Sequence, residues 1–442
     1  MLLASTFEEK YTKHNVTLGD IFMKIHFKNA NILTGLEIVR GDVVVDGDKI
    51  VYVGSNPPDG ADKEIDVKGN VLMSGFVNAH AHNPMTLLRG VSDDTCLDVW
   101  LEENMFPLEQ KLTPDDVYWG EMLGIAESVS AGITSFEECY FYPDKLIEAV
   151  KKSGIRCRLG LPGMFKQKSI GEVISNLDAE ISKLDNDLIR PVIYAHSTYT
   201  VGEEQLLSLV DYSAKHKLPM SLHLSETLKE VGDMTAELNQ TPPEYLESLG
   251  VLDRNCTLYH CVHVDKDDMA LLSRYDANIV TCPSSNLKLG SGIAPVYSML
   301  ECGLNVAIGT DGAASNNNLD MFKEMFLTST LSKGLLCDPS IMPASEVLKM
   351  ATINGAKALG LENCGDIKVG YKADIILVNL NSPHQMPVNN IISNLVYSTK
   401  SSDVYFTMVN GKILYDNGKF YIGEDVEKIY KNCQNIMKRV LG

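Results

Sequence analysis

The central part of the chain alternates short apolar runs with segments of helical pattern, and this alternation restricts the fold more than any other feature. Each of eight apolar runs is followed by a stretch long enough for a helix. Strands that alternate with helices form parallel sheets, because the chain must cross the sheet between them. Eight such strands favour closure into a (β/α)8 barrel of the TIM type over an open sheet. The predicted strands are Gly75–His80, Gly132–Phe136, Ile155–Leu161, Val192–His196, Met220–Leu224, Cys256–His260, Asn278–Cys282 and Leu304–Gly309.

The segment between the first two predicted strands carries the signals of a helix start. Thr113 is a good N-cap, Pro114 suits the first helical position, and Asp115 and Asp116 are acidic residues in the first turn. The sequence therefore predicts a helix that begins at Pro114.

Both ends of the chain are rich in predicted strands that are separated by Gly and Asp turns. Neither end has enough strands to close on its own, so we expect the two ends to pack together as one small β-sandwich. The predicted domains are an N-terminal extension (1–22), a composite β-sandwich with a C-terminal helix (23–75 and 365–442) and the catalytic barrel (76–364).

Composition and charge exclude several functional classes. The formal charge is -19, and no basic stripe offsets it, which argues against nucleic acid and favours a small molecule as the partner. No apolar stretch is long enough for a membrane helix, and the N-terminal apolar run is too short for a secretory signal. The ten Cys form no CxxC pair, and we expect them to be buried thiols in the reducing cytoplasm. A homo-oligomer, either a dimer or a tetramer, is the expectation from base rates.

Four side chains of metal-binding type fall at the carboxyl ends of predicted strands. His80 and His82 end the first strand two residues apart, so both point to the same face. His223 ends the fifth strand, and Asp311 follows the eighth. Barrel enzymes place catalytic groups at these ends, so the four should meet. Three His and one Asp suit one divalent ion, Zn²⁺ first of all, with Ni²⁺ and Fe²⁺ as alternatives.

Further residues at the same ends suit proton transfer and substrate contact. Glu226 lies three positions beyond His223, where it can face the substrate, and His260 ends the sixth strand near the expected ion. His196 ends the fourth strand and should line the pocket, and Trp100 is a further candidate for substrate contact. No lysine stands at the end of the fourth strand, where two-metal hydrolases of this architecture carry a carbamylated one. A single metal ion is therefore expected.

These residues occur in phrases that resemble the amidohydrolase superfamily, and within it the branch of 5'-methylthioadenosine/S-adenosylhomocysteine deaminases and related chlorohydrolases. The resemblance runs from about Met23 to the C-terminus. The phrases are Gly75-Phe76-Val77-Asn78-Ala79-His80-Ala81-His82, Leu88-Arg89-Gly90, His223-Leu224-Ser225-Glu226, His260-Cys261-Val262-His263, Ser285-Asn286-Leu287-Lys288-Leu289 and Gly309-Thr310-Asp311-Gly312-Ala313-Ala314-Ser315-Asn316-Asn317.

The resemblance implies a barrel-plus-sandwich fold and a metal-dependent hydrolytic deaminase that releases ammonia from an adenosine-type purine. It implies His80, His82, His223 and Asp311 as metal ligands. It also implies Glu226 and His260 as the proton-handling pair, with Asp311 using a free oxygen to take a proton from water. His196 matches a histidine of the substrate pocket.

The chain departs from the family pattern at two places, and the second bears on the substrate. Ser74 stands where the family usually has Pro, which should affect only a local turn. After the third strand the deaminases carry arginines that hold the ribose and amino-acid end, whereas this chain offers Lys166 and Lys168 in that loop. The alternatives that remain are the same fold acting on guanine, cytosine or a chlorotriazine, and a catalytically inactive barrel that serves as a binding protein.

Overall fold

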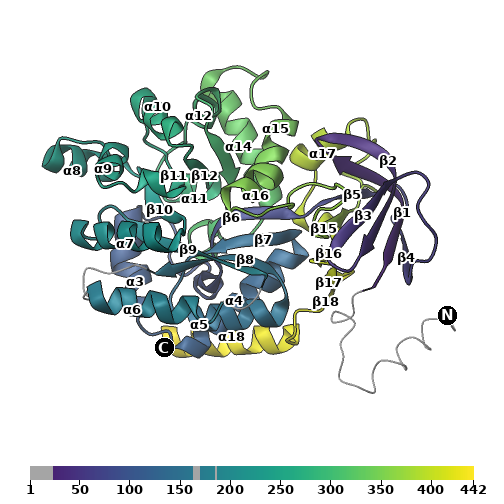
Figure 1. Ribbon diagram of the computed structural model, residues 1–442, viewed down its shortest axis with the longest axis horizontal. Coiled ribbons are helices and arrows are strands. Elements are labelled where there is room, and N and C mark those ends of the chain that lie inside the picture. The colour runs from purple at the N-terminus through teal and green to yellow at the C-terminus, as the bar shows by residue number, and fades with distance from the viewer. Residues whose placement is uncertain (1–22, 163–169, 185–186) are drawn as a thin grey trace.

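The computed structural model describes residues 23–162, 170–184 and 187–442. The predicted extension 1–22 and the two loop lysines, Lys166 and Lys168, lie outside the described residues. Within the described part the chain forms two separate sheets and a shell of helices (Figure 1).

The first sheet is the predicted barrel. Its strands run parallel in chain order from β6 to β13, and the short β14 pairs with β6, so the sheet closes on itself. Each predicted strand overlaps an observed one, which confirms the fold class. The strands are β6 (Phe76–His82), β7 (Ile133–Glu138), β8 (Arg156–Pro162), β9 (Ile189–Ser197), β10 (Met220–Leu224), β11 (Thr257–His260), β12 (Asn278–Thr281), β13 (Asn305–Ile308) and β14 (Asp311–Gly312).

The sequence predicts one continuous strand, Leu304–Gly309, at the eighth position, and the structure differs. It is divided into β13 and β14, and Asp311 lies inside β14 instead of in a loop after the strand. Gly309 permits the break, since a Cβ at this position would lie 2.8 Å from the Cβ of His80. In the resulting register Asp311 pairs with Ala81 and Gly312 with His82. The closure of the barrel thus brings the carboxylate to the histidines.

Helices cover the outside of the barrel (Figure 1). The predicted start at Pro114 is confirmed: the side chain of Thr113 accepts the N–H of Asp116, and the Asp116 carboxylate accepts the N–H of Thr113. The helices between the strands are α4 (Pro114–Ser130), α5 (Pro143–Ser153), α6 (Ile170–Ile181), α7 (Glu203–His216), α8 (Leu228–Leu238), α9 (Pro242–Ser248), α10 (Lys266–Arg274), α11 (Pro283–Lys288), α12 (Val296–Glu301) and α14 (Met321–Leu336).

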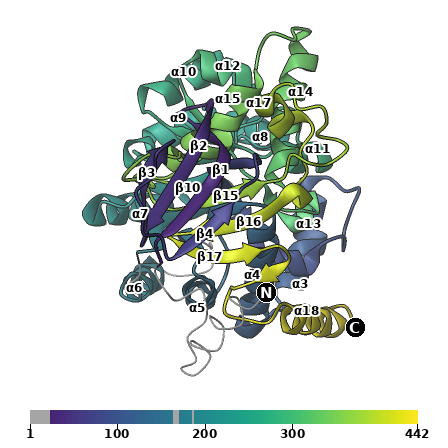
Figure 2. The same cartoon turned by 90° about the vertical axis from the view of Figure 1, so that its right-hand side faces the viewer.

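The second sheet is built from both ends of the chain, as predicted. Its order is β18-β17-β16-β15-β5-β1-β2-β3, with β4 also on β1, so the two ends meet where β15 pairs with β5. Figure 2 shows the purple strands of the N-terminal end and the yellow strands of the C-terminal end in this one sheet. The sheet folds over one apolar core, in which the rings of Phe27 and Phe406 lie 5.6 Å apart. The strands are β1 (Ile25–Thr34), β2 (Glu37–Asp46), β3 (Lys49–Gly54), β4 (Lys63–Asp66), β5 (Val71–Ser74), β15 (Ile375–Val378), β16 (Val404–Val409), β17 (Lys412–Asp416) and β18 (Lys419–Phe420).

The C-terminal helix leaves the second sheet and packs against the barrel. Helix α18 (Val426–Leu441) lies along α4 (Figure 1). There Arg439 pairs with Asp116, and the Cys433 thiol reaches the carbonyl of Trp119. Its buried face therefore extends the core of the barrel and not that of the small sheet.

The burial of the cysteines and the length of the apolar helices were both predicted from the sequence. Cys157, Cys256, Cys261 and Cys282 are buried free thiols as expected, but Cys96, Cys302 and Cys337 are exposed, which corrects the expectation for those three. Their segments lie at the surface of the barrel, where apolar neighbours in the sequence do not guarantee burial. Among the helices that the structure describes, none is long and apolar enough to cross a membrane.

Candidate active site

Three imidazoles and one carboxylate converge at the carboxyl end of the barrel. One ring nitrogen from each of His80, His82 and His223 lies within 4.8 Å of the other two. The Oδ1 atom of Asp311 lies 3.5 Å from the Nε2 atoms of both His80 and His82. The four residues come from the first, fifth and eighth strand positions, as the sequence predicted.

Backbone carbonyls orient two of the imidazoles. The Nδ1 atom of His82 lies 2.6 Å from the carbonyl oxygen of Cys139, and the Nδ1 atom of His223 lies 2.7 Å from that of His196. A carbonyl only accepts, so both Nδ1 atoms carry the proton and both Nε2 atoms keep a free lone pair. This is the arrangement that metal-binding histidines require.

His80 shows that the cluster suits a cation. Its side chain is fully buried, yet neither ring nitrogen has a hydrogen-bond partner. Burial lowers its pKa to about 3, so the ring is a neutral ligand at physiological pH. A buried imidazole without a partner costs free energy unless a ligand satisfies it. Three neutral nitrogens and one carboxylate fit the donor set of a catalytic zinc site, so a divalent ion fits here.

The carboxylate of Asp311 is held by hydrogen bonds on both oxygens. Oδ1 accepts the N–H of Gly312 at 2.7 Å, and Oδ2 accepts the hydroxyls of Ser285 and Ser315. Both oxygens of Asp311 therefore accept hydrogen bonds, which fix the orientation of the carboxylate. Burial favours the neutral acid, but contacts with the histidines outweigh it and keep the pKa of Asp311 well below its usual range.

Glu226 and His260 face the same space. Their side chains lie 3.9 Å apart between Oε2 and Nε2, and both are almost fully buried. The Nδ1 atom of His260 donates to the amide oxygen of Asn286 at 2.7 Å, which leaves Nε2 directed at Glu226. Burial raises the pKa of Glu226 to about 7, so a substantial fraction of this carboxyl is protonated near neutral pH.

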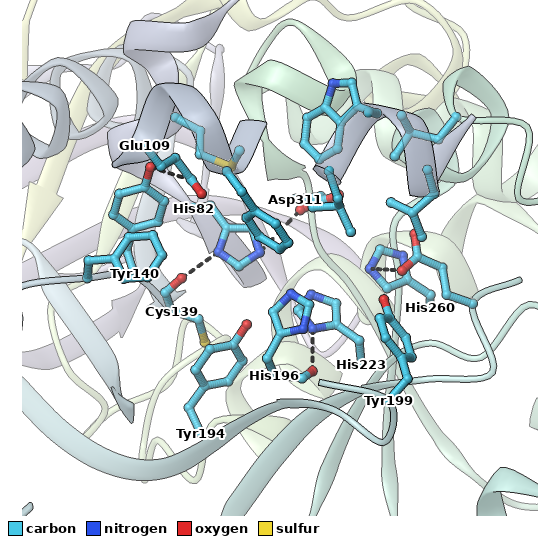
Figure 3. Close-up of a pocket in the computed structure, with 18 residues that line it drawn as sticks. His82, Glu109, Cys139, Tyr140, Tyr194, His196, Tyr199, His223, His260 and Asp311 are labelled. Carbon is cyan, nitrogen blue, oxygen red and sulfur yellow. Dashed lines mark hydrogen bonds and ion pairs between the residues drawn. The ribbon is translucent and has the colours of Figure 1, made fainter. Parts of the chain in front are cut away.

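One pocket opens above the cluster. The pocket is lined by seven predicted site residues: His82, His196, His223, Glu226, His260, Asp311 and Trp100. The fully buried His80 is not among the lining residues. In Figure 3 the labelled Glu109 and Tyr140 lie on one side of the pocket, and Tyr199 and His260 on the other. The remaining lining is largely apolar and aromatic: Met85, Leu97, Leu101, Phe106, Glu109, Cys139, Tyr140, Phe141, Tyr194, Tyr199 and Leu289.

Comparison with known proteins identifies the family. The pattern of the amidohydrolase family matches residues 71–414, which is most of the chain. The chain belongs to the amidohydrolase family. It is 40% identical to a 5-methylthioadenosine/S-adenosylhomocysteine deaminase of Acetivibrio thermocellus over 95% of this chain and 100% of the relative. It is 41% identical to the protein of the same name from Thermococcus kodakarensis, over 89% of this chain and 94% of that one.

A solved structure agrees in fold with nearly the whole chain. The crystal structure of an adenosine deaminase from Xanthomonas campestris with bound zinc matches with a TM-score of 0.91 and 30% identity. The match covers 94% of this chain and 98% of that protein. The likeness therefore includes both the barrel and the second sheet.

Several residues of the site were missed by sequence reasoning. Glu109, at the end of α3 (Phe106–Glu109), is a pocket carboxyl that accepts the hydroxyl of Tyr140 at 2.6 Å, and burial raises its pKa to about 7. Ser285 and Asn286 hold Asp311 and His260. Both appeared in the family phrases, which was the one signal that could have found them. Glu109 lies in no strand end or motif, so no sequence signal pointed to it.

Proposed function

We propose that this amidohydrolase is a hydrolytic deaminase that releases ammonia from an adenosine-type purine, such as 5'-methylthioadenosine, S-adenosylhomocysteine or another 5'-modified adenosine. The observation that carries the proposal is the convergence of His80, His82, His223 and Asp311 beside a buried Glu226 in one aromatic pocket. Relatives about 40% identical over nearly the full chain carry the deaminase name, which supports the same substrate class.

We assign His80, His82, His223 and Asp311 as the ligands of one divalent ion, most simply Zn²⁺. When bound, such an ion would supply an activated water molecule as the nucleophile at neutral pH. The fit rests on the two free Nε2 lone pairs and on the unpartnered ring of His80.

The chain's own residues then handle the protons. Glu226, in the protonated form that is substantially populated near neutral pH, donates its proton to the ring nitrogen beside the amino-bearing carbon and makes that carbon more electrophilic. His260, held through Asn286, presents Nε2 toward the attacking water and orients it. Asp311, ionised, accepts a proton from that water even though both of its oxygens already accept hydrogen bonds. Glu226 and Asp311 then pass protons to the departing ammonia.

The walls of the pocket suit a purine nucleoside. The faces of Trp100, Phe106 and Tyr199 offer stacking area for a planar ring. His196 and Glu109 are polar groups at which ribose hydroxyls or ring nitrogens can bind. Among the residues that the structure describes, no lysine or arginine lines this pocket.

A substrate panel tests the proposal. The zinc-loaded protein should release ammonia from adenosine analogues, with the ultraviolet change from an adenine to a hypoxanthine ring. Guanine, cytosine and a chlorotriazine in the same panel test the alternative amidohydrolase reactions. Turnover of one of these and none of the adenosines would replace the proposed substrate class. Absence of turnover on every compound would favour an inactive binding protein.

A further inference from the structure

A second glutamate, which lies outside the pocket, accepts hydrogen bonds from the backbone that carries Glu226. Glu230 lies in the first turn of α8 and is 7% exposed. Its Oε1 atom accepts the N–H of Ser225 and the hydroxyl of Thr198, both at 3.1 Å. Its Oε2 atom accepts the N–H of Glu226 at 2.8 Å. One buried carboxylate thus accepts two consecutive backbone N–H groups and one hydroxyl.

The backbone at this point has an unusual conformation. Ser225 has a φ of 49°, in the left-handed region that residues other than glycine seldom adopt. This conformation turns two successive N–H groups toward the same side, as in the anion-binding nests of other loops, and the carboxylate of Glu230 occupies the concave side. The same turn directs the side chain of Glu226 into the pocket.

Glu230 also connects neighbouring loops. Thr198 follows β9, two residues after His196, whereas Ser225 and Glu226 follow β10. The carbonyl of Ser225 accepts the N–H of His263, which follows β11, at 2.9 Å. The loops after three successive barrel strands are therefore tied together at Ser225 and Glu230.

We propose that Glu230 is a positioning residue that holds the carboxyl of Glu226 in place for proton transfer. The inference rests on the proposed function in that Glu226 is the proton donor. A carboxyl group suits this position because three donors converge on its two oxygens. A glutamine would place an NH₂ group, which only donates, against one of these donors.

The substitution Glu230→Gln tests the role, with Glu237→Gln as the matched control. Glu237 lies on the same helix, is exposed, and loses the same charge. We expect kcat of Glu230→Gln to fall about 10²-fold, since a displacement of about 1 Å has effects of this size. KM should stay within about threefold and the zinc content should be unchanged. The control should match the wild type, and an unchanged kcat in Glu230→Gln would overturn the proposal.

A double-mutant cycle separates positioning from general destabilisation. If Glu230 acts through Glu226, then Glu230→Gln should have no further effect on kcat in a Glu226→Gln background. A full additional loss of about 10²-fold in that background would show that Glu230 acts by another route and would overturn the proposal.

Amide hydrogen exchange supplies a readout that does not depend on activity. Peptides that contain Ser225 and Glu226 should exchange faster in Glu230→Gln than in the wild type or in Glu237→Gln. Exchange at the wild-type rate would overturn the proposal even if the protein deaminates none of the adenosines, so the two failures are distinguishable. If Glu230→Gln does not fold, Glu230→Asp, which keeps the charge on a shorter side chain, undergoes the same measurements with the same criteria.

Discussion

The barrel interior contains two polar regions, and they differ in how their groups are satisfied. Beneath the histidines, Arg158 pairs with Glu137 at 3.3 Å and donates to the carbonyl of Ala358 and the hydroxyl of Thr257. Tyr259 donates to the same Glu137. We call these side chains, Arg158, Glu137, Tyr259 and Thr257, the interior network. At the mouth, by contrast, both ring nitrogens of the buried His80 have no hydrogen-bond partner.

The two regions are in contact, because the ring of Tyr259 stacks on His80 at 3.8 Å. Burial is nearly equal on both sides of that contact. The charged side chains of the interior network each make at least one hydrogen bond, although Arg158 Nε and Glu137 Oε2 make none, whereas the ring of His80 makes no hydrogen bond at all. Arg158 and Glu137 neutralise each other's charge inside the protein and need no ligand, whereas a buried imidazole that makes no hydrogen bond at all is available to one. We therefore expect substitutions at the mouth to affect metal binding and turnover, and substitutions in the interior network to affect stability.

Loss of the metal ion should have the largest effect on turnover and stability. The residues responsible should lie at the mouth of the barrel. We expect the isolated protein to hold one zinc ion per chain. Chelation, or the substitution His223→Ala, should abolish turnover and lower the free energy of unfolding by about 4 kcal/mol at a thousandfold excess of zinc over its Kd. Metal analysis and thermal unfolding measure both effects. His216→Ala, which removes an exposed histidine, should retain the ion; two ions per chain would contradict the single-metal site.

Glu226→Gln should separate proton transfer from metal binding within the mouth. We expect kcat to fall by about 10²–10⁴-fold, the usual contribution of one general acid, while the zinc content stays constant. Ammonia release and metal analysis on the same sample measure the two quantities. Turnover at the wild-type rate would remove Glu226 from the mechanism, and a loss of zinc would place it among the ligands instead.

Arg158→Met should affect stability and leave the metal site loaded. Removal of one partner from a buried ion pair costs about 3–5 kcal/mol, because the carboxylate of Glu137 is left without its counter-charge. Urea unfolding measures the loss. Arg190→Met is the matched control, since Arg190 pairs with Arg158 in the register of β8 and β9 but is exposed. We expect the control to change stability by less than about 0.5 kcal/mol. If Arg158→Met instead lost its zinc, the proposed division between the two regions would be wrong.

The smallest effect is expected at the pocket wall. Trp100→Phe should raise KM for the substrate by about tenfold or less and change kcat little, because an aromatic contact contributes about 0.5–1.5 kcal/mol. Trp119→Phe is a natural control, since it is the second of the two tryptophans and lies on α4 outside the pocket. Steady-state kinetics of both variants give the comparison. An equal rise of KM in both would argue against contact between Trp100 and the substrate.

The placement of the histidines could be predicted from sequence, whereas parts of their surroundings could not. His80 and His82 are two residues apart on a strand, and His223 ends another, so period-two alternation and the common edge of parallel strands determine where they point. The break between β13 and β14 could not be predicted, because it depends on the close approach of Gly309 to His80 across 229 positions of sequence. The same holds for the two serines that hold Asp311.

The sequence alone determined the barrel, the pairing of the two chain ends in a second sheet, and the four candidate metal ligands. Each follows from a local pattern that repeats along the chain or recurs at strand ends. Only the tertiary structure decided that both oxygens of Asp311 are hydrogen bonded, that Glu109 enters the pocket, and that Glu230 holds the backbone of Glu226. The physical reason is that these features depend on contacts between loops and side chains from separate segments of the chain. Such contacts leave no periodic pattern in the amino-acid sequence.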